Sequence, residues 1–394
     1  MYKSYKFRMY PNEEQKILLE KHFGSCRFVW NHFLSLHNEV YKNTGKGMNR
    51  FGMINLLPLL KKEYEWLKEV NSQSLQQELT HLDNAFHRFF KKISKYPVFK
   101  KKRSGESFAV PQRFSLNDNH LKIPKFKTPL RVFVSRNIEG EMRQLTISKT
   151  PSGKYFVSIL VKTEGEIPEP EKIEVDTSIG IDMGIKSFLT ASTGLQISNP
   201  KNLKKSEKRL ALLQRRLSRK KKGSKNSNKA RIKVARIQEH IANQRMDFQH
   251  KISDMLLKNY DTIITEDLNV AGMVKNHHLA KSIGDVGWSS FMVMLKTKAV
   301  SRGKNIIQID RFEPSSKMCS RCGNIKKTLK LSERIYHCDV CGLNIDRDLN
   351  AAINIKRIGL MNTGVPTVCG EFTPMEIPLT GYLIYEGISY VSLK

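Results

Sequence analysis

The sequence of 394 residues is short of acidic side chains. It contains 37 Asp and Glu against 68 Lys and Arg, which gives a formal net charge of +31 at pH 7. This excess of positive charge is too large to be explained by solvent-exposed side chains alone. It predicts a polyanionic partner, namely a nucleic acid contacted at many phosphates. A membrane surface is the alternative, but the chain has no basic amphipathic anchor.

Long apolar runs and an N-terminal signal segment are also missing. No run is long enough to span a bilayer, and the opening residues MYKSYK have no apolar core. We therefore expect a cytosolic protein without a membrane partner. Cysteine is scarce too, because Cys26 and Cys369 stand alone and the other four form one cluster. That usage excludes a disulfide scaffold and indicates a reducing compartment.

The clustered cysteines form two knuckles, Cys319-Ser-Arg-Cys322 and Cys338-Asp-Val-Cys341, with fifteen residues between them. This spacing predicts a zinc ribbon in which four thiolates hold one Zn²⁺ ion. A redox pair or two unrelated pairs of thiols are the alternatives. An acid-rich turn follows at residues 346–348 and opens a predicted helix that keeps two asparagines, at positions 350 and 354, on one face.

The N-terminal part predicts one strand followed by helices. Apolar and basic residues alternate over residues 5–9, and Asn12 with Gln15 forms a capping-box pattern, after which a helical pattern continues to about residue 99. An apolar stripe from Leu75 to Phe89 predicts a core-facing side. The opposite side carries Gln76 and other polar residues. It is either solvent-exposed or a surface that reads base edges, since amides pair with adenine in a major groove.

From residue 100 the period becomes two, which predicts short antiparallel strands near residues 130–134, 145–147 and 155–161. A strand before the helices and several after them predict a small β-barrel with a helical domain inserted. The acidic stretch 164–176, with its two prolines, is predicted to be a linker.

A predicted apolar strand ends at Asp182 and is followed by a turn that contains glycine, in the sequence GIDMGIK at 180–186. A ribonuclease-H-like fold starts in this way. Actin-like ATPases and sugar kinases share this kind of turn, so the motif alone leaves both classes open. Residues 201–250 predict a basic helical hairpin whose tip is Arg219, Lys220, Lys221 and Lys222. Its alternatives are a solvated coiled coil and a phosphate-binding arm. Further predictions are a strand over 260–268, a helix over 288–300 and a strand over 305–309.

Three acids then occupy comparable places in one α/β fold: Asp182 and Glu266 end strands, and Asp348 enters the last helix. Converging carboxylates suit Mg²⁺ or Mn²⁺, and two such ions support in-line phosphodiester hydrolysis. Neither a Ser-His-Asp or Cys-His set nor a Walker loop is present to suggest another chemistry.

At these residues the chain resembles TnpB, the OrfB-type nuclease family of insertion sequences and a relative of compact type V CRISPR effectors. The resemblance spans nearly the whole chain. Its motifs are YKFRMYP at 5–11, CRFVWN at 26–31, GIDMGIK at 180–186, EDL at 266–268 and DRDLNAAIN at 346–354. Residues 379–394 do not match the family.

The resemblance implies a multidomain α+β protein. Residues 1–10 and 100–170 would form a β-barrel wedge domain, and 11–99 an inserted helical recognition domain. Residues 177–311 and 346–360 would form a RuvC nuclease domain carrying the hairpin 201–250. The zinc ribbon would be 312–345, and 361–394 a C-terminal tail.

The implied activity is transposon-encoded, RNA-guided cleavage of DNA beside a short target-adjacent motif. By motif match, Asp182, Glu266 and Asp348 would be catalytic, with Asp346 as the alternative to Asp348, and Gln76 would contact the adjacent motif. The implied partners are a guide RNA and double-stranded target DNA, bound by a monomer or a dimer in the prokaryotic cytoplasm, near the nucleoid. The alternatives are a nuclease-inactive RNA-guided repressor, a transposition accessory protein and an actin-like ATPase.

Overall fold

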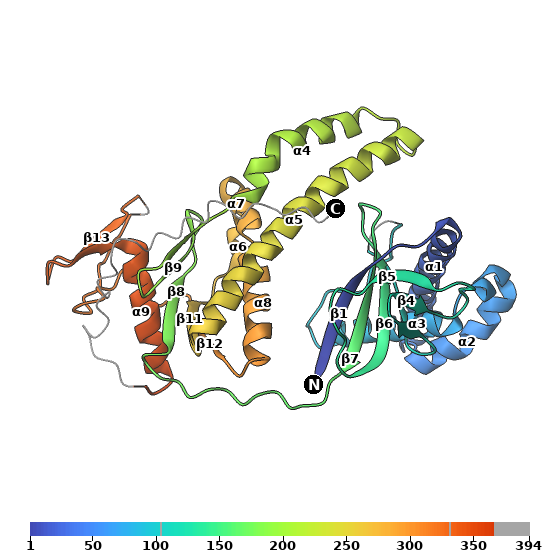
Figure 1. Ribbon diagram of the computed structural model, residues 1–394, viewed down its shortest axis with the longest axis horizontal. Helices are drawn as coiled ribbons and strands as arrows, with labels where there is room; N and C mark the ends of the chain where they lie inside the picture. The colour runs from blue at the N-terminus through green and yellow to red at the C-terminus, as the bar shows by residue number, and fades with distance from the viewer. Residues whose placement is uncertain (103–104, 331, 366–394) are drawn as a thin grey trace. The chain divides into compact units, whose positions relative to one another are not determined.

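The computed structural model describes residues 1–102, 105–330 and 332–365, so that Cys369 and most of the predicted tail lie outside the described residues. The chain forms two compact units (Figure 1). The first contains residues 1–166 together with 231–236, and the second begins at residue 167 and resumes at 237. No helix among the described residues is both long and apolar enough to cross a bilayer.

The first unit is built on a seven-stranded antiparallel sheet with the order β2-β6-β7-β1-β5-β4-β3. Its strands are β1 (Tyr2–Met9), β2 (Glu106–Val110), β3 (Ser115–Asn117), β4 (His120–Lys122), β5 (Leu130–Phe133), β6 (Glu141–Lys149) and β7 (Tyr155–Lys162). The three predicted strand regions correspond to β5, β6 and β7. The alternation of apolar and polar residues did not predict β2, β3 and β4. Strands β3 and β4 have only three residues each, which is too short for the pattern to show.

The predicted β-barrel is present as a half-barrel sheet. Strands β2 and β3 are its two edges, and they do not pair with each other. Helices α1 and α3 contact β2, and buried side chains of sheet and helices share one core that includes Phe7, Leu19, Leu75, Phe108 and Val157. The sheet buries its apolar face beneath helices, so closure on itself is unnecessary.

The helices of the first unit are α1 (Glu13–Thr44), α2 (Arg50–Glu63), the 3₁₀ helix η1 (Glu65–Glu69) and α3 (Ser72–Phe90). The capping box at the start of α1 is confirmed: the Gln15 backbone N–H donates to Asn12 Oδ1 over 2.8 Å, and the Asn12 N–H donates to Gln15 Oε1 over 3.0 Å. The prediction of helix to residue 99 is wrong, because α3 ends at Phe90 and Lys92 then takes a left-handed conformation with φ 57°.

The second unit contains a five-stranded sheet with the order β10-β9-β8-β11-β12. Its strands are β8 (Ser178–Asp182), β9 (Ser187–Ala191), β10 (Gln196–Ser198), β11 (Thr262–Glu266) and β12 (Asn305–Ile309). Strands β8, β11 and β12 are parallel, whereas β9 and β10 are antiparallel to their neighbours. The strand predicted over 305–309 is confirmed with the same bounds.

The helices of the second unit are α4 (Asn202–Ser218), α5 (Lys225–Asn259), α6 (Val270–Met273), α7 (His277–Val286), α8 (Trp288–Val300) and α9 (Arg347–Asn362). The helix predicted over 288–300 is therefore confirmed. The second arm of the basic hairpin is longer than predicted, since α5 continues to Asn259. Helix α9 also continues two residues beyond 360, where the tail was predicted to begin. Two short strands, β13 (Ile335–His337) and β14 (Asn344–Asp346), lie between β12 and α9.

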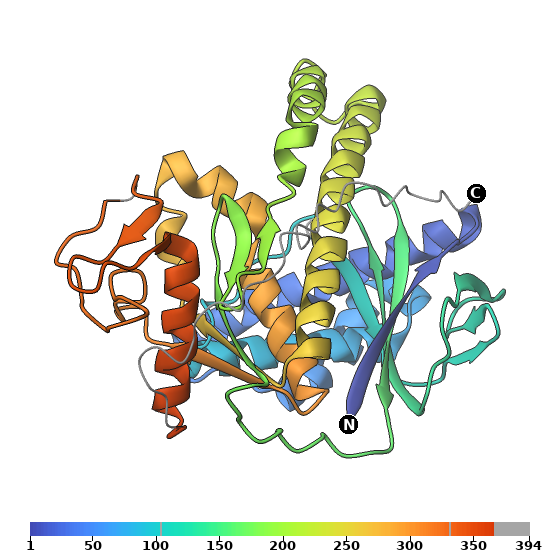
Figure 2. The same ribbon diagram turned by 60° about the vertical axis from the view of Figure 1, so that its left-hand side comes forward.

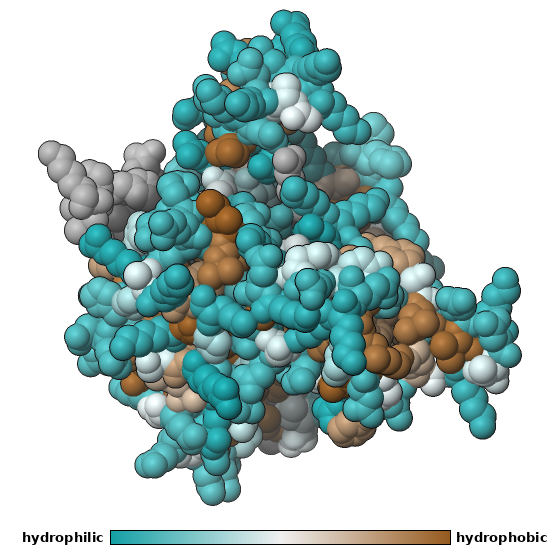
Figure 3. Space-filling view, turned by 90° about the vertical axis from the view of Figure 1, so that its right-hand side faces the viewer, coloured by the Kyte–Doolittle hydropathy of each residue, from teal (hydrophilic) through white to brown (hydrophobic). Residues whose placement is uncertain are grey.

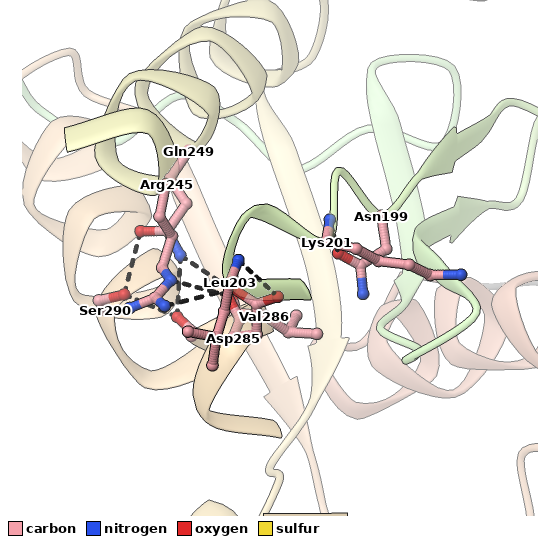
Figure 4. A network of polar contacts seen from close by, with 9 residues as sticks. Asn199, Lys201, Leu203, Arg245, Gln249, Asp285, Val286 and Ser290 are labelled. Carbon is pink, nitrogen blue, oxygen red and sulfur yellow. Dashed lines mark hydrogen bonds and ion pairs between the residues drawn. The ribbon is translucent and has the colours of Figure 1, made fainter. Parts of the chain in front are cut away.

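A polar network fixes the base of the hairpin (Figure 4). The Asp285 carboxylate accepts the Leu203 N–H over 3.0 Å, while Arg245 Nε donates to the Asp285 carbonyl over 2.7 Å. Gln249 Nε2 donates to the carbonyls of Val286 and Gly287. Helix α4 has no side-chain cap of its own, so the Asp285 carboxylate satisfies one of its free N–H groups.

Candidate active site and metal centre

Two acidic residues end adjacent parallel strands. Asp182 is the last residue of β8 and Glu266 the last of β11, and the register that pairs Thr265 with Ile181 places these two ends side by side. Neighbouring strands lie about 4.8 Å apart, and residues in register project from the same face. Both acids are partly buried. The two carboxylates therefore converge at one edge of the sheet.

Helix α9 covers that face of the sheet and brings the third acid. A Cβ atom on Gly180 would lie 2.3 Å from the Ala352 carbonyl oxygen of α9, and one on Gly359 would lie 2.3 Å from Ile264 Cγ2. These contacts require glycine, because any side chain would push the helix off the strands. Asp348 lies one turn before Ala352, towards the end of β8 that carries Asp182. Helix α9 runs alongside β8 in both ribbon views (Figures 1 and 2).

Asp346 and Asp348 have different local roles. Asp346 is the N-cap of α9, and its Oδ1 accepts the N–H groups of Asp348 over 2.9 Å and of Leu349 over 3.0 Å. Its side chain thus satisfies two N–H groups of the first turn. Asp348 lies inside the first turn, and its carboxylate has no such capping role. This difference favours Asp348 over Asp346 as the third acid of the site.

The charges of the three acids interact. Burial raises the pKa of Asp182, and the carboxylates of Glu266 and Asp348 raise it further, to about 7, against a smaller opposing effect of Arg347. A carboxyl near like charges resists ionisation, and an added cation would relieve that repulsion. Among the described residues, the four cysteines form a group close enough together to hold a metal ion, and the three acids do not form such a group.

A serine that the sequence analysis did not assign contacts the second acid. The Ser315 side chain is buried, and its hydroxyl donates to Glu266 Oε1. The Ser315 carbonyl in turn accepts the Asn354 side-chain N–H over 2.8 Å. The sequence Pro-Ser-Ser at 314–316 resembles the family without assigning a role to this serine, and its contact with Glu266 becomes visible only in three dimensions.

Helix α9 also holds the chain that enters the first knuckle. Asn350 donates to the Met318 carbonyl over 2.8 Å and accepts the Ser320 N–H over 3.0 Å. Asn354 donates to the same Met318 carbonyl over 2.6 Å, and Arg357 donates to Asn354 Oδ1 over 3.1 Å. All three side chains are buried on one face of α9, which extends the predicted pair of asparagines by an arginine. The cysteine knuckle and the acidic site therefore share a single helix.

The four predicted zinc ligands are brought together. The sulfur atoms of Cys319, Cys322, Cys338 and Cys341 all lie within 4.8 Å of one another, and the Cys319–Cys341 and Cys322–Cys338 pairs are 3.6 Å apart. Tetrahedral zinc with Zn–S bonds of about 2.3 Å requires sulfurs about 3.8 Å apart. The cluster fits a structural zinc ion.

Backbone hydrogen bonds prepare the second knuckle for thiolates. Burial raises the pKa of the Cys338 thiol, but hydrogen bonds from the backbone N–H groups of Cys341 and Val340, together with those of the Cys322 and Cys341 thiols, lower it to about 6. The two knuckles also share one loop form, since Gly323 N–H donates to the Cys319 carbonyl and Gly342 N–H to the Cys338 carbonyl. Two loops of the same form around one cluster of four sulfur atoms suit a metal ion rather than a redox exchange.

The remaining predicted site residues are exposed. Gln76 is exposed on α3 of the first unit, and its neighbours Gln73 and Gln77 are partly buried. Arg219, Lys220, Lys221 and Lys222 are exposed at the turn between α4 and α5. Their positions permit contact with nucleic acid, and their roles stay predictions.

Comparison with known proteins identifies the family. Residues 158–277 match the OrfB family of IS605 elements, described as "Probable transposase", residues 288–355 match a Cas12f1-like TNB domain, and residues 1–46 match a helix-turn-helix domain. In this structure the last segment comprises β1 and α1. A Cas12f1 chain solved with sgRNA and target DNA covers 90% of this chain at 14% identity, with a TM-score of 0.48 and 98% of its own length matched.

Two relatives match over almost their full length. A Streptomyces pristinaespiralis protein named "Putative RNA-guided DNA endonuclease" is 38% identical over 94% of this chain and 91% of its own length. The Escherichia coli K12 protein "Putative RNA-guided DNA endonuclease InsQ" is 32% identical over 95% of this chain and 96% of its own length. The chain therefore belongs to the TnpB (OrfB, IS605-type) family of transposon proteins.

Proposed function

We propose that this protein is an RNA-guided DNA endonuclease whose active site consists of Asp182, Glu266 and Asp348. The observation that carries the proposal is the placement of these acids at two adjacent strand ends and the first turn of α9, where burial and the charges of Glu266 and Asp348 raise the pKa of Asp182 to about 7. The strand order β10-β9-β8-β11-β12, with β9 antiparallel, supports a ribonuclease-H-like (RuvC) fold. The names of the two near-full-length relatives support the same activity.

The three carboxylates are the residues that would hold two Mg²⁺ or Mn²⁺ ions, since hard cations prefer oxygen ligands. When bound, such a pair activates a water molecule and stabilises the leaving oxygen of a phosphodiester. Glu266 is oriented by the Ser315 hydroxyl, and Asp348 by the helix turn that Asp346 caps. Deprotonation of Asp182 completes the negative site, and this step is favoured above about pH 7 in the free protein.

The charge of the chain supplies the binding surface. We propose guide RNA and double-stranded DNA as partners, because +31 formal charges require a polyanion. Hydrophilic side chains dominate the space-filling view (Figure 3). Arg219 to Lys222 at the hairpin tip would contact phosphates, and Gln76 would read the target-adjacent motif through an amide–base pair. The zinc ion would fix the ribbon and, through α9, the start of the acidic site.

The test is cleavage of labelled duplex DNA by purified protein carrying its co-purified RNA, whose sequence should map to the flank of the protein's own gene. Asp182→Ala, Glu266→Ala and Asp348→Ala should each abolish cleavage and leave guided DNA binding nearly unchanged, because affinity comes from base pairing and phosphate contacts. Asp267→Ala is the matched control. It removes an acid adjacent to Glu266 that pairs with Arg311 at the surface, and it should cut normally.

Two outcomes would contradict the proposal. Cleavage by the Asp182→Ala variant would show that the acids assigned here are not catalytic. Guided DNA binding by wild-type protein without any cleavage, in Mg²⁺ and in Mn²⁺, would support the alternative of a nuclease-inactive repressor.

A further inference from the structure

A basic and aromatic segment of the first unit begins in the last turn of helix α3. Residues 88–102 read RFFKKISKYPVFKKK and contain seven cationic residues and no acid. We call them the lysine–aromatic segment. Lys91, Lys92, Lys95, Lys101 and Lys102 are exposed, and none of them forms an ion pair with another described residue. The segment therefore presents uncompensated positive charge.

The same segment exposes large apolar side chains. Phe90 is 67% exposed, Ile93 63%, Val98 74% and Phe99 53%. Single exposed apolar residues are common on protein surfaces, but four within ten residues indicate a surface that a partner covers. The partner must also be anionic, because the lysines alternate with these residues.

The backbone of the segment is fixed although it is neither helix nor strand after Phe90. Trp30 Nε1 donates to the Val98 carbonyl over 3.0 Å, and the Asn31 side chain accepts the Lys100 N–H over 2.7 Å while donating to the Lys100 carbonyl over 3.0 Å. The Lys100 ammonium lies 4.0 Å over the Trp30 ring. Helix α1 thus holds the inner side of the segment, and its outer side chains are preorganised.

The turn that starts the segment keeps a lysine where glycine is preferred. Ile93 N–H donates to the Arg88 carbonyl and Lys92 N–H to the Phe89 carbonyl, each over 2.9 Å, which is a Schellman motif. Its left-handed residue is Lys92, with φ 57°. A lysine at this position costs conformational energy that glycine would avoid, and its side chain is exposed.

We propose that the lysine–aromatic segment binds unpaired nucleotides of RNA. Exposed phenyl rings stack on bases that are free of pairing, while neighbouring lysines neutralise the phosphates between them. Duplex DNA hides its base faces, so the exposed rings would have no role on it. The assignment of this RNA as the guide rests on the proposed function.

The experiment measures binding of the intact protein to a fluorescent 20-nucleotide oligouridylate and to a 20-base-pair DNA duplex. The double variant Phe90→Ala, Phe99→Ala should weaken RNA binding at least about fivefold, because each stacked base is worth about 1 kcal/mol or more. Duplex binding should change less than about twofold. Phe312→Ala is the matched control, since its ring is 88% exposed elsewhere on the chain.

Salt dependence separates the role of the lysines from that of the rings. Lys91→Gln with Lys95→Gln should reduce the slope of log K against log salt for RNA by about 1.4, at about 0.7 per lost phosphate contact. The phenylalanine variants should weaken binding without altering that slope. Both sets should keep the wild-type melting temperature, because the altered side chains are exposed.

Photo-crosslinking tests the location even where other basic surfaces also bind the probe. An oligouridylate carrying 5-iodouridine should crosslink to residues 84–106, which cleavage after acidic residues releases as one peptide because no acid occurs between Asp83 and Glu106. Crosslinks confined to other peptides, together with unchanged RNA affinity in the phenylalanine variant, would overturn the proposal.

Three further outcomes are informative. An equal loss of RNA and duplex binding would overturn the assignment to unpaired nucleotides. A dimer that dissociates in the phenylalanine variant with unchanged RNA affinity would show that a second copy covers the surface instead, which also overturns it. Loss of RNA binding in the segment variants alongside cleavage by Asp182→Ala would sustain this inference while the proposed active site failed.

Discussion

Asp182→Asn should make the free protein more stable at alkaline pH. In the wild type, burial and the carboxylates of Glu266 and Asp348 raise the pKa of Asp182 to about 7, from an ordinary value near 4. The folded state therefore holds a proton between about pH 4 and pH 7 that the unfolded chain has released. The free energy of unfolding falls as pH rises through this window, and the loss is complete above about pH 7.

The difference in pKa sets the size of the effect. About three pKa units at 1.36 kcal/mol each give a ceiling of about 4 kcal/mol for the second unit without Mg²⁺. Partial contact of Asp182 with water and relaxation of the site should reduce the observed value to about 2 kcal/mol. The asparagine variant cannot ionise at this position, so it should lack this part of the pH dependence.

The assay is denaturant unfolding of both proteins at pH 5 and pH 8.5 in Mg²⁺-free buffer, without a chelator so that zinc is retained. The variant should gain about 1.3 kcal/mol on the wild type between pH 5 and pH 8.5, which is about two thirds of the whole effect, because about one of the three pKa units lies below pH 5. Mg²⁺ should then stabilise the wild type more than the variant. Asp267→Asn, which alters a surface ion pair, controls for a general charge effect. A variant no more stable than the wild type at pH 8.5 would refute the argument that the three acids repel one another.

Four other predictions concern single residues. Asp348→Ala should abolish DNA cleavage, whereas Asp346→Asn should still cut because its amide oxygen can cap α9; the reverse result in a cleavage assay would exchange their roles. Cys338→Ser should lose zinc by elemental analysis and lose cleavage as well, since a ribbon this small does not fold without its metal; full activity in zinc-free protein would refute this link. Gln76→Ala should relax the target-adjacent motif in a randomised-flank assay by roughly 1–3 kcal/mol at one base, and an unchanged motif would count against it. Ser315→Ala should lower cleavage and weaken Mn²⁺ binding measured by electron paramagnetic resonance, with Ser315→Thr restoring both at unchanged zinc content; equal Mn²⁺ affinity in all three proteins would remove the positioning role.

The sequence by itself determined the features that depend on local spacing. Two CxxC pairs fifteen residues apart predict one zinc site, because each pair supplies two of the four sulfur ligands that tetrahedral zinc requires. The capping box at Asn12 and Gln15 is equally local, since both hydrogen bonds join groups three residues apart. Family motifs also predicted Asp182, Glu266 and Asp348 as site residues, because each lies in a short pattern of apolar strand or helix residues, and their catalytic role stays a prediction.

Only the tertiary structure decided how distant segments meet. Sheet closure depends on which face the helices cover, and α1 and α3 cover the sheet of the first unit, so the predicted barrel stays open. The hydrogen bond from Ser315 to Glu266 joins residues 49 positions apart. The hydrogen bonds that hold residues 98 and 100 against α1 join residues 68 and 69 positions apart. A buried polar group forms a hydrogen bond with the partner that tertiary packing places beside it. A local sequence pattern does not identify that partner.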